Sequence, residues 1–218
     1  MSNLIVGRAA VLVIDMQHDF VDPGAACYAI GAEEIVSRIG SVVVAARRAG
    51  IPVIFTQEAH RPGGVDAGRE ADGGTGDLYS SANTGSAVPA HCVEGTAGIE
   101  IVDELAPAPG DLRIVKRRYS CFLGTDLELL LGNLEIQTLI VSGVCSDVCV
   151  LWTVGEAFQR DYHVRLLEDC VAGTTREASD AAVKIMTGLI GWGGLTGDRL
   201  VRELGAASSP MASAAAPR

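Results

Sequence analysis

The 218-residue sequence predicts an α/β fold, a three-layer α-β-α sandwich with a mostly parallel central sheet of five to six strands. Two observations predict this class. Short runs rich in β-branched residues alternate with segments of helical periodicity along most of the chain, as in parallel sheets with crossover helices. Several of these runs are apolar at every position, which is typical of strands that are buried on both faces.

The strands are expected where β-branched residues cluster between turn-forming residues. Five such segments are 9–14, 52–56, 112–115, 138–142 and 163–167. A sixth strand is expected to begin at residues 194–196. Their spacing leaves room for a helix in most of the connections.

Apolar residues at helical spacing predict the helices between them. Positions 35–46 indicate a first helix that ends at Gly50, a residue type that terminates helices. Residues 125–128 have the spacing of a capping box ahead of a second helix. Ser146 is a candidate N-cap for a third, and 178–190 predicts a fourth.

The length and the single alternating pattern predict one domain, over residues 1–205. Residues 57–98 are rich in Gly, Ser, Asp and Pro without clear periodicity, and a loop of this length inside a domain is usually functional. We therefore expect 57–98 to be a long active-site loop region. Residues 206–218 are mostly Ala, Ser and Pro, which indicates a flexible tail.

The charge balance restricts the class of partner. The chain has 17 basic and 27 acidic residues, a net charge of −10, which argues against binding to nucleic acid or to an anionic membrane. No apolar run reaches the ~18 to 20 residues of a membrane span. Arg8 interrupts the first apolar stretch, so no signal peptide is indicated. These features predict a cytoplasmic protein with a small-molecule partner and six reduced cysteines.

Three reactive residues follow predicted strands. Asp15 ends the first strand, Lys116 ends the third, and Cys149 lies on the first turn of the helix after the fourth. Ligands of open α/β sheets bind at the carboxyl ends of the strands, so these side chains are expected to meet. The same residues also suit plain structural roles: a packed cysteine, a capping carboxylate and a solvated lysine.

Together the three side chains would make an acyl-transfer site that requires no cofactor. The helix dipole and the Lys116 ammonium favour a Cys149 thiolate, and Asp15 is placed to take the thiol proton and later to activate water. Backbone N–H groups between Cys145 and Cys149 would hold the developing oxyanion. Cys145 and Cys149, one helical turn apart, also suit a metal pair, although no histidine lies nearby in sequence.

Three segments resemble the isochorismatase-like cysteine hydrolases, the family of nicotinamidases and of carbamoyl and ureido amidohydrolases. They are residues 10–20 around Asp15, 116–127 around Lys116 and 139–150 around Cys149. The resemblance extends over roughly residues 8–200.

This resemblance implies a role for each matching residue. Asp15 would be the base, Lys116 would support it and orient the substrate, and Cys149 would be the nucleophile. The peptide bond between Val144 and Cys145 would be cis, and the amides of Cys145 and Cys149 would form the oxyanion hole. The resemblance also implies a homodimer or homotetramer.

The predicted function is hydrolysis of a carboxamide, ureido or lactam C–N bond through a thioester. The presence of Cys149 argues against cleavage of the isochorismate vinyl ether, because such enzymes typically lack this cysteine. Two enzymatic alternatives are a metal-assisted nicotinamidase and a lactam hydrolase acting on a natural product such as a streptothricin-type antibiotic. A non-enzymatic alternative is a thiol-sensing or binding scaffold, which would form a reversible disulfide between Cys145 and Cys149.

A divalent metal, zinc in particular, is a further possibility. Residues 56–60 and 89–93 resemble the metal-binding segments of nicotinamidases, and the candidate ligands are Glu58, His60 and His91. Glu58 stands where the aspartate ligand is usual, and the ureido and carbamoyl branch keeps similar residues without metal. In that branch the two histidines would only form hydrogen bonds that shape the loop.

The substrate pocket is the least defined part of the site. Phe20 matches an aromatic residue that lines the pocket of nicotinamidases. Further candidates are Glu58, Arg61, Tyr119, Phe122 and Trp152. A carboxylate at Glu58 would suit a cationic or N–H-donating substrate, and Arg61 an anionic one.

Overall fold

The central sheet has five strands, all parallel. The computed structural model describes residues 4–25, 27–68 and 91–208. Its strands are β1 (Arg8–Ile14), β2 (Val53–Glu58), β3 (Leu112–Lys116), β4 (Ile136–Val144) and β5 (His163–Ala172), in the order β3-β2-β1-β4-β5. β1, β2 and β4 are almost completely buried, as the continuous apolar runs predicted.

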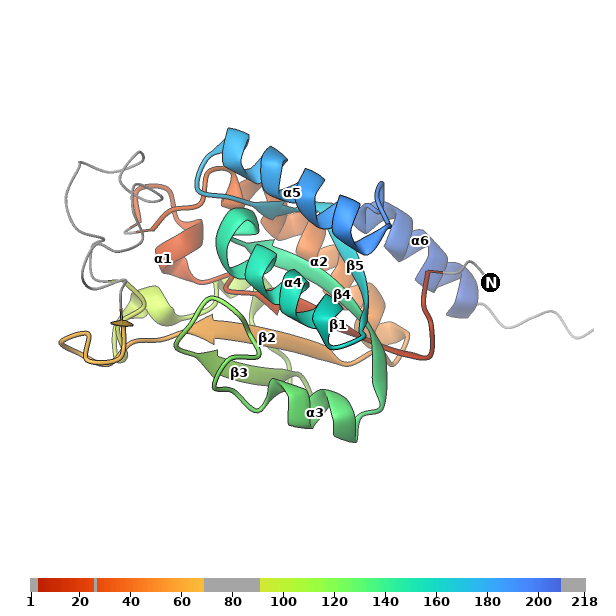
Figure 1. Ribbon diagram of the computed structural model, residues 1–218, viewed down its shortest axis with the longest axis horizontal. Helices are drawn as coiled ribbons and strands as arrows, with labels where there is room; N and C mark the ends of the chain where they lie inside the picture. The colour runs from red at the N-terminus through yellow and green to blue at the C-terminus, as the bar shows by residue number, and fades with distance from the viewer. Residues whose placement is uncertain (1–3, 26, 69–90, 209–218) are drawn as a thin grey trace, which may run out of the picture.

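Helices cover both faces of this sheet, so the predicted fold class is confirmed. α2 (Ala32–Arg48) and α6 (Gly197–Ser208) pack together on one face. α3 (Leu127–Asn133), α4 (Leu151–Gln159) and α5 (Arg176–Ile190) lie on the other (Figure 1). A short helix, α1 (His18–Val21), follows β1, and the single turns η2 (Ala97–Ile99) and η3 (Asp103–Leu105) precede β3.

α2 forms where the periodicity predicted a helix. It buries an apolar stripe of residues at helical spacing, namely Ile35, Ile39, Val42, Val43 and Ala46. Gly50 follows the end of the helix with a φ of +68°, a conformation that favours glycine. α5 begins two residues before the predicted start, with Thr175 as N-cap accepting a hydrogen bond from the Ala178 amide at 3.0 Å.

Two predicted helix caps are replaced by other contacts. The Thr125 hydroxyl accepts a hydrogen bond from the Leu127 amide, and α3 begins after Asp126 instead of forming the capping box. The Ser146 hydroxyl is buried and donates to the Ser179 hydroxyl of α5 at 2.8 Å, because that helix packs directly against it. The third helix therefore begins with a wider turn, η4 (Ser146–Val150), before α4.

The sixth strand predicted at 194–196 does not form within the described part of the chain. This segment instead runs along the exposed edge of β5, where the Glu168 amide donates to the Leu195 carbonyl at 3.0 Å. The Gly197 amide donates to the Asp169 carboxylate at 2.8 Å. One of these bonds joins two backbone groups and the other ends on a side chain, so the segment covers the strand edge without forming a sixth strand.

Functional side chains collect at the carboxyl edge of the sheet. β1 is the central strand, and the chain continues from it to β2 on one side, whereas β4 lies on its other side. This reversal is a topological switch point, the usual ligand site of open α/β sheets. Among the described residues, no helix is both long and apolar enough to span a membrane.

Candidate active site

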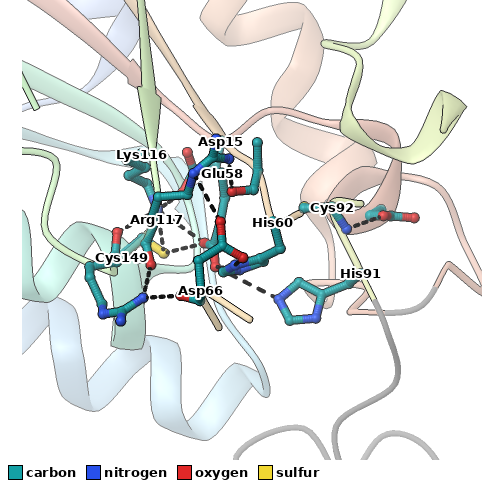
Figure 2. Close-up of polar contacts among 12 residues, drawn as sticks. Asp15, Glu58, His60, Asp66, His91, Cys92, Lys116, Arg117 and Cys149 are labelled. Carbon is teal, nitrogen blue, oxygen red and sulfur yellow. Dashed lines mark hydrogen bonds and ion pairs between the residues drawn. The ribbon is translucent and has the colours of Figure 1, made fainter. Parts of the chain in front are cut away.

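The three residues predicted from strand ends converge at this edge (Figure 2). Lys116 Nζ lies 2.7 Å from Asp15 Oδ2 and 3.4 Å from Cys149 Sγ. All three side chains are buried, and Cys149 is only 1% exposed. Residues that are more than 130 positions apart in sequence therefore form one compact cluster.

Thr56 on β2 holds the Asp15 carboxylate in place. Its hydroxyl donates to Asp15 Oδ1 at 2.6 Å and accepts a hydrogen bond from the Asp15 amide at 3.2 Å. Asp15 itself has a φ of +50°, a left-handed conformation that turns the chain out of β1. Thr56 was not predicted as a site residue, although a polar residue at the end of an otherwise apolar strand segment is a signal that the sequence carries.

Glu58 at the end of β2 is the fourth polar member of the cluster. Its Oε2 atom lies 3.0 Å from Lys116 Nζ and accepts a hydrogen bond from the Cys149 thiol at 3.6 Å. Gln17 fixes the Glu58 backbone: its side-chain amide donates to the Glu58 carbonyl and accepts from the Glu58 amide, both at 2.8 Å. Gln17 was also missed, and its sequence position carries no signal for this pairing.

Burial and neighbouring charges move the carboxyl groups in opposite directions. Burial raises the pKa of Asp15, and the Lys116 ammonium offsets only part of this effect. Burial also acts on Glu58, but Lys116 and hydrogen bonds from His60 and His91 outweigh it and hold the pKa of Glu58 well below its ordinary range. Glu58 is therefore a permanent anion, whereas Asp15 is able to take up a proton.

The pKa values of the lysine and of the cysteine are both raised, for different reasons. Burial alone would lower the pKa of Lys116, but the electrostatic interactions with Asp15, Cys149 and Glu58 outweigh it and raise the pKa well above 10.5. Burial raises the pKa of Cys149 well above its ordinary value despite the Lys116 ammonium, and the nearby carboxylates add to this effect. The direction of this shift favours the neutral thiol over the thiolate expected from the helix dipole and Lys116.

Cys149 lies in η4, whose backbone is tightly bonded. The amides of Val148 and Val150 both donate to the Cys145 carbonyl at 3.0 Å, and the Thr153 hydroxyl donates to the Cys149 carbonyl at 2.7 Å. The peptide bond between Val144 and Cys145 is cis, as the resemblance implied. Within the described residues, neither Cys145 nor Cys149 forms a disulfide.

The candidate metal ligands also lie together, on the far side of Glu58 from Lys116. Glu58 Oε1 is 3.0 Å from His60 Nε2 and 3.7 Å from His91 Nε2, and one donor atom of each residue lies within 4.8 Å of the others. One carboxylate and two imidazoles at this spacing fit a three-ligand site for a divalent cation such as zinc. Burial would lower the pKa of His91, but hydrogen bonds to Cys27 and Glu58 raise it to about 11. Metal binding therefore requires His91 to lose a proton.

Of the predicted pocket residues, Glu58 and Phe20 lie at the site. The Phe20 ring is buried and meets the His91 ring edge to face, with 6.0 Å between centroids. Arg61 is exposed and forms an ion pair with Asp66 at 3.1 Å. Tyr119 is half-buried against the hydrophobic core.

Phe122 and Trp152 are placed elsewhere. The Phe122 ring stacks on Tyr162 at 5.9 Å between centroids and lies under the Arg160 guanidinium. Trp152 is 61% exposed on α4 and borders a surface groove. Phe122 lies in the connection between β3 and α3 and Trp152 on the exposed side of α4, so packing and not proximity in sequence to Lys116 or Cys149 decides where each ring lies. Residues 69–90 of the predicted loop lie outside the described residues.

Fold and site together define an α/β protein with a buried cysteine–lysine–carboxylate centre at the carboxyl edge of its sheet. The isochorismatase domain model matches residues 9–193, and the chain belongs to this family. The resemblance drawn from the three sequence segments is therefore confirmed.

Two curated relatives match most of the chain. A protein of Arabidopsis thaliana, named as a probable inactive nicotinamidase, is 34% identical over 81% of this chain and 86% of its own length. The ureidoacrylate amidohydrolase RutB of Caulobacter vibrioides is 34% identical over 87% of this chain and 88% of its own length.

Solved structures with the same fold include three informative neighbours. An isochorismatase family protein from Desulfovibrio vulgaris has a TM-score of 0.78 at 34% identity, covering 91% of this chain and all of that one. N-carbamoylsarcosine amidase from Thermoplasma acidophilum has a TM-score of 0.70 at 26% identity, covering 88% and 98%. The pyrazinamidase of Pyrococcus horikoshii, solved in complex with zinc, has a TM-score of 0.69 at 25% identity, covering 84% and 96%. The predicted enzyme class, a hydrolase for C–N bonds other than peptide bonds, is confirmed by the relatives named as amidohydrolases.

Proposed function

We propose that the protein is a cysteine amidohydrolase that cleaves a C–N bond of a small ureido or carboxamide compound through a thioester. The observation that carries this proposal is the position of Lys116 Nζ, 2.7 Å from Asp15 Oδ2 and 3.4 Å from Cys149 Sγ. A cation between a carboxylate and a thiol stabilises the anion that forms when the thiol proton moves.

In the first step Cys149 Sγ attacks the substrate carbonyl while its proton passes to Asp15. The raised pKa of the thiol makes this transfer part of the attack and not a preceding ionisation. The amides of Cys145 and Cys149 stabilise the oxyanion. Asp15 then protonates the leaving nitrogen, which departs as ammonia or an amine and leaves the thioester.

In the second step a water molecule replaces the departed nitrogen. Asp15, again ionised, takes a proton from this water as it attacks the thioester carbonyl. The tetrahedral intermediate expels the sulfur, and the thiol recovers its proton from Asp15. Lys116 keeps its charge throughout, because its pKa is raised well above 10.5.

Glu58 supports a ureido substrate over nicotinamide. Its ionised Oε2 atom lies 3.6 Å from Cys149 Sγ, beside the position of the reacting carbonyl, where it would accept an N–H of the substrate. A ureido group carries N–H donors on both sides of its carbonyl, whereas nicotinamide carries them on one side. The relatives support this choice, since one is named a ureidoacrylate amidohydrolase and another a probable inactive nicotinamidase.

Replacing the nucleophile tests the mechanism. We expect Cys149→Ala to abolish turnover and leave the fold intact, because the site loses only one sulfur atom. Ammonia release is measured over nicotinamide, biuret, ureidoacrylate, N-carbamoyl amino acids and lactams. Cys170→Ala, which removes a buried thiol from β5 on the far side of β4, is the matched control and is expected to keep wild-type turnover. Turnover by Cys149→Ala near the wild-type rate would contradict the proposal.

A second candidate is a metal-assisted nicotinamidase, which the cluster of Glu58, His60 and His91 favours. These residues would hold a divalent cation, which would act as a Lewis acid on a substrate donor atom beside Cys149. The chain's own contribution is to offer Glu58 Oε1 and the two Nε2 atoms while Glu58 Oε2 stays with Lys116.

Metal removal separates the two candidates. We expect the protein dialysed against EDTA to keep its activity on ureido substrates, and His60→Ala to bind less zinc without losing this activity. Zinc bound per chain is measured by elemental analysis, and ammonia release is measured before and after zinc is restored. Loss of all activity with the chelator, recovered by zinc and accompanied by nicotinamide turnover, would favour the second candidate.

A further inference from the structure

The turn that carries Cys149 is fastened to the loop between β5 and α5, residues 173–175. The Thr174 amide donates to Asp147 Oδ1 at 2.9 Å, and the Thr174 hydroxyl donates to Asp147 Oδ2. One residue earlier, Ser146 is bonded to Ser179 at the start of α5. Two consecutive side chains of η4 therefore anchor this turn to the segment that follows the neighbouring strand.

The loop approaches the turn too closely for a side chain between them. A Cβ atom added at Gly173 would lie 2.6 Å from both Asp147 Oδ1 and Ser146 Oγ. Thr174 and Ser146 are buried, so their bonds are shielded from water. The Asp147 carboxylate is thus held at a defined position against the loop backbone, and hydrogen bonds to a charged acceptor are among the stronger ones in proteins.

Asp147 lies midway between Cys145 and Cys149, the two residues whose amides we assign to the oxyanion hole. We infer that Asp147 is a positioning residue: through Thr174 it holds η4 so that these two amides converge on the oxyanion of the substrate. The inference rests on the proposed function. Oxyanion donors act only within a few tenths of an ångström of their best distance, and losing one costs roughly 10²- to 10³-fold in rate.

The role predicts a separation between two reactions of the same sulfur. Acylation by p-nitrophenyl acetate joins Cys149 Sγ to the acetyl carbon, releases p-nitrophenolate and passes the thiol proton to Asp15, with an oxyanion at the carbonyl. Alkylation by iodoacetamide displaces iodide at a saturated carbon and forms no oxyanion. Misplaced amides slow only the first reaction.

The experiment compares both rates in four variants of the full chain. For Asp147→Ala we expect the acylation burst to slow by roughly 10- to 100-fold, with iodoacetamide alkylation of Cys149 within about twofold of wild type. Gly173→Ala should have the same effect, because its added Cβ atom pushes the Asp147 carboxylate away although the aspartate itself is not replaced. Asp147→Asn should restore most of the burst, since its oxygen still accepts from the Thr174 amide and its NH₂ group donates to the hydroxyl. Asp180→Ala removes an exposed aspartate of α5 and is the matched control.

Burst kinetics follow p-nitrophenolate by absorbance, alkylation is followed by peptide mass spectrometry, and thermal melting verifies that each variant is folded. An Asp147→Ala burst within twofold of wild type would overturn the inference. A parallel fall of both rates would do the same, because it indicates a merely structural role. A burst that persists in Cys149→Ala would instead contradict the proposed function.

Discussion

Asp15 and Glu58 share one ammonium group, that of Lys116, and both are shielded from water. Their environments differ, since Glu58 also accepts from His60 whereas Asp15 accepts from one threonine hydroxyl. The pKa of Asp15 is raised and that of Glu58 is lowered, and such a divergence is how a site assigns different roles to two like groups. We interpret Asp15 as the proton carrier and Glu58 as the fixed anion.

The fall of kcat/KM at low pH tests whether Asp15 is the proton carrier. Asp15 must be ionised to accept the thiol proton, so activity is present above its raised pKa and is lost as the pH falls through it. We expect the acid limb of kcat/KM above 3.8, the ordinary value for an aspartate. The profile is measured by ammonia release, with circular dichroism at each pH as the control for unfolding. An acid limb at or below 3.8 would contradict the assignment.

The elements of the site are joined most closely where β1 and β4 end. Gly143 pairs with Ile14 across these two strands and has a φ of +110°. A Cβ atom at Gly143 would lie 2.1 Å from the Ile14 carbonyl oxygen. Backbone and not a movable side chain fills this space, so the strand that leads to Cys149 lies directly against the strand that leads to Asp15.

We predict that Gly143→Ala lowers the free energy of unfolding by about 3 kcal/mol or more, from overpacking together with the unfavourable φ. Urea unfolding measures this change. The matched control is Gly188→Ala in α5, where the space is open. There the substitution should stabilise the protein by about 0.5–1 kcal/mol, because alanine is the better helix former. Similar stability changes in the two variants would refute the explanation.

At the scale of the whole molecule, the two helical layers have different relations to the site. α4, α5 and η4 lie on one face of the sheet and carry the nucleophile or its supports. α2 and α6 pack on each other on the opposite face, where Leu200 of α6 is completely buried. The second layer therefore contributes stability, whereas the first layer also determines the geometry of the site.

Removing buried volume from the α2–α6 layer tests this division. We expect Leu200→Ala to lower the free energy of unfolding by about 2–5 kcal/mol and to leave the rate of Cys149 alkylation in the folded protein unchanged. Leu129→Ala, at an exposed position of α3, is the control and should change stability by less than about 0.5 kcal/mol. Urea unfolding and iodoacetamide labelling measure the two quantities. A slower alkylation in folded Leu200→Ala would show that the layers are coupled.

Local pattern alone was enough for much of the architecture. The five strand segments and α2 were predicted because apolar periodicity follows directly from which faces are buried. The polar residues Asp15 and Lys116 were found because they stand at strand ends, and a parallel sheet places all such ends at one edge. α6 was missed because its short polar sequence carries only a narrow apolar stripe, which gains its burial from α2.

The sequence by itself therefore determined the alternation of strands and helices, the edge at which the reactive residues gather and the family resemblance. Only the tertiary structure decided that Glu58 reaches Cys149 and Lys116, since Glu58 pairs with Lys116 in the register of β2 and β3. Burial also decided that the pKa of the Cys149 thiol is raised. These properties depend on distances between strands and on the loss of water around charges, which arise only when segments remote in sequence pack together.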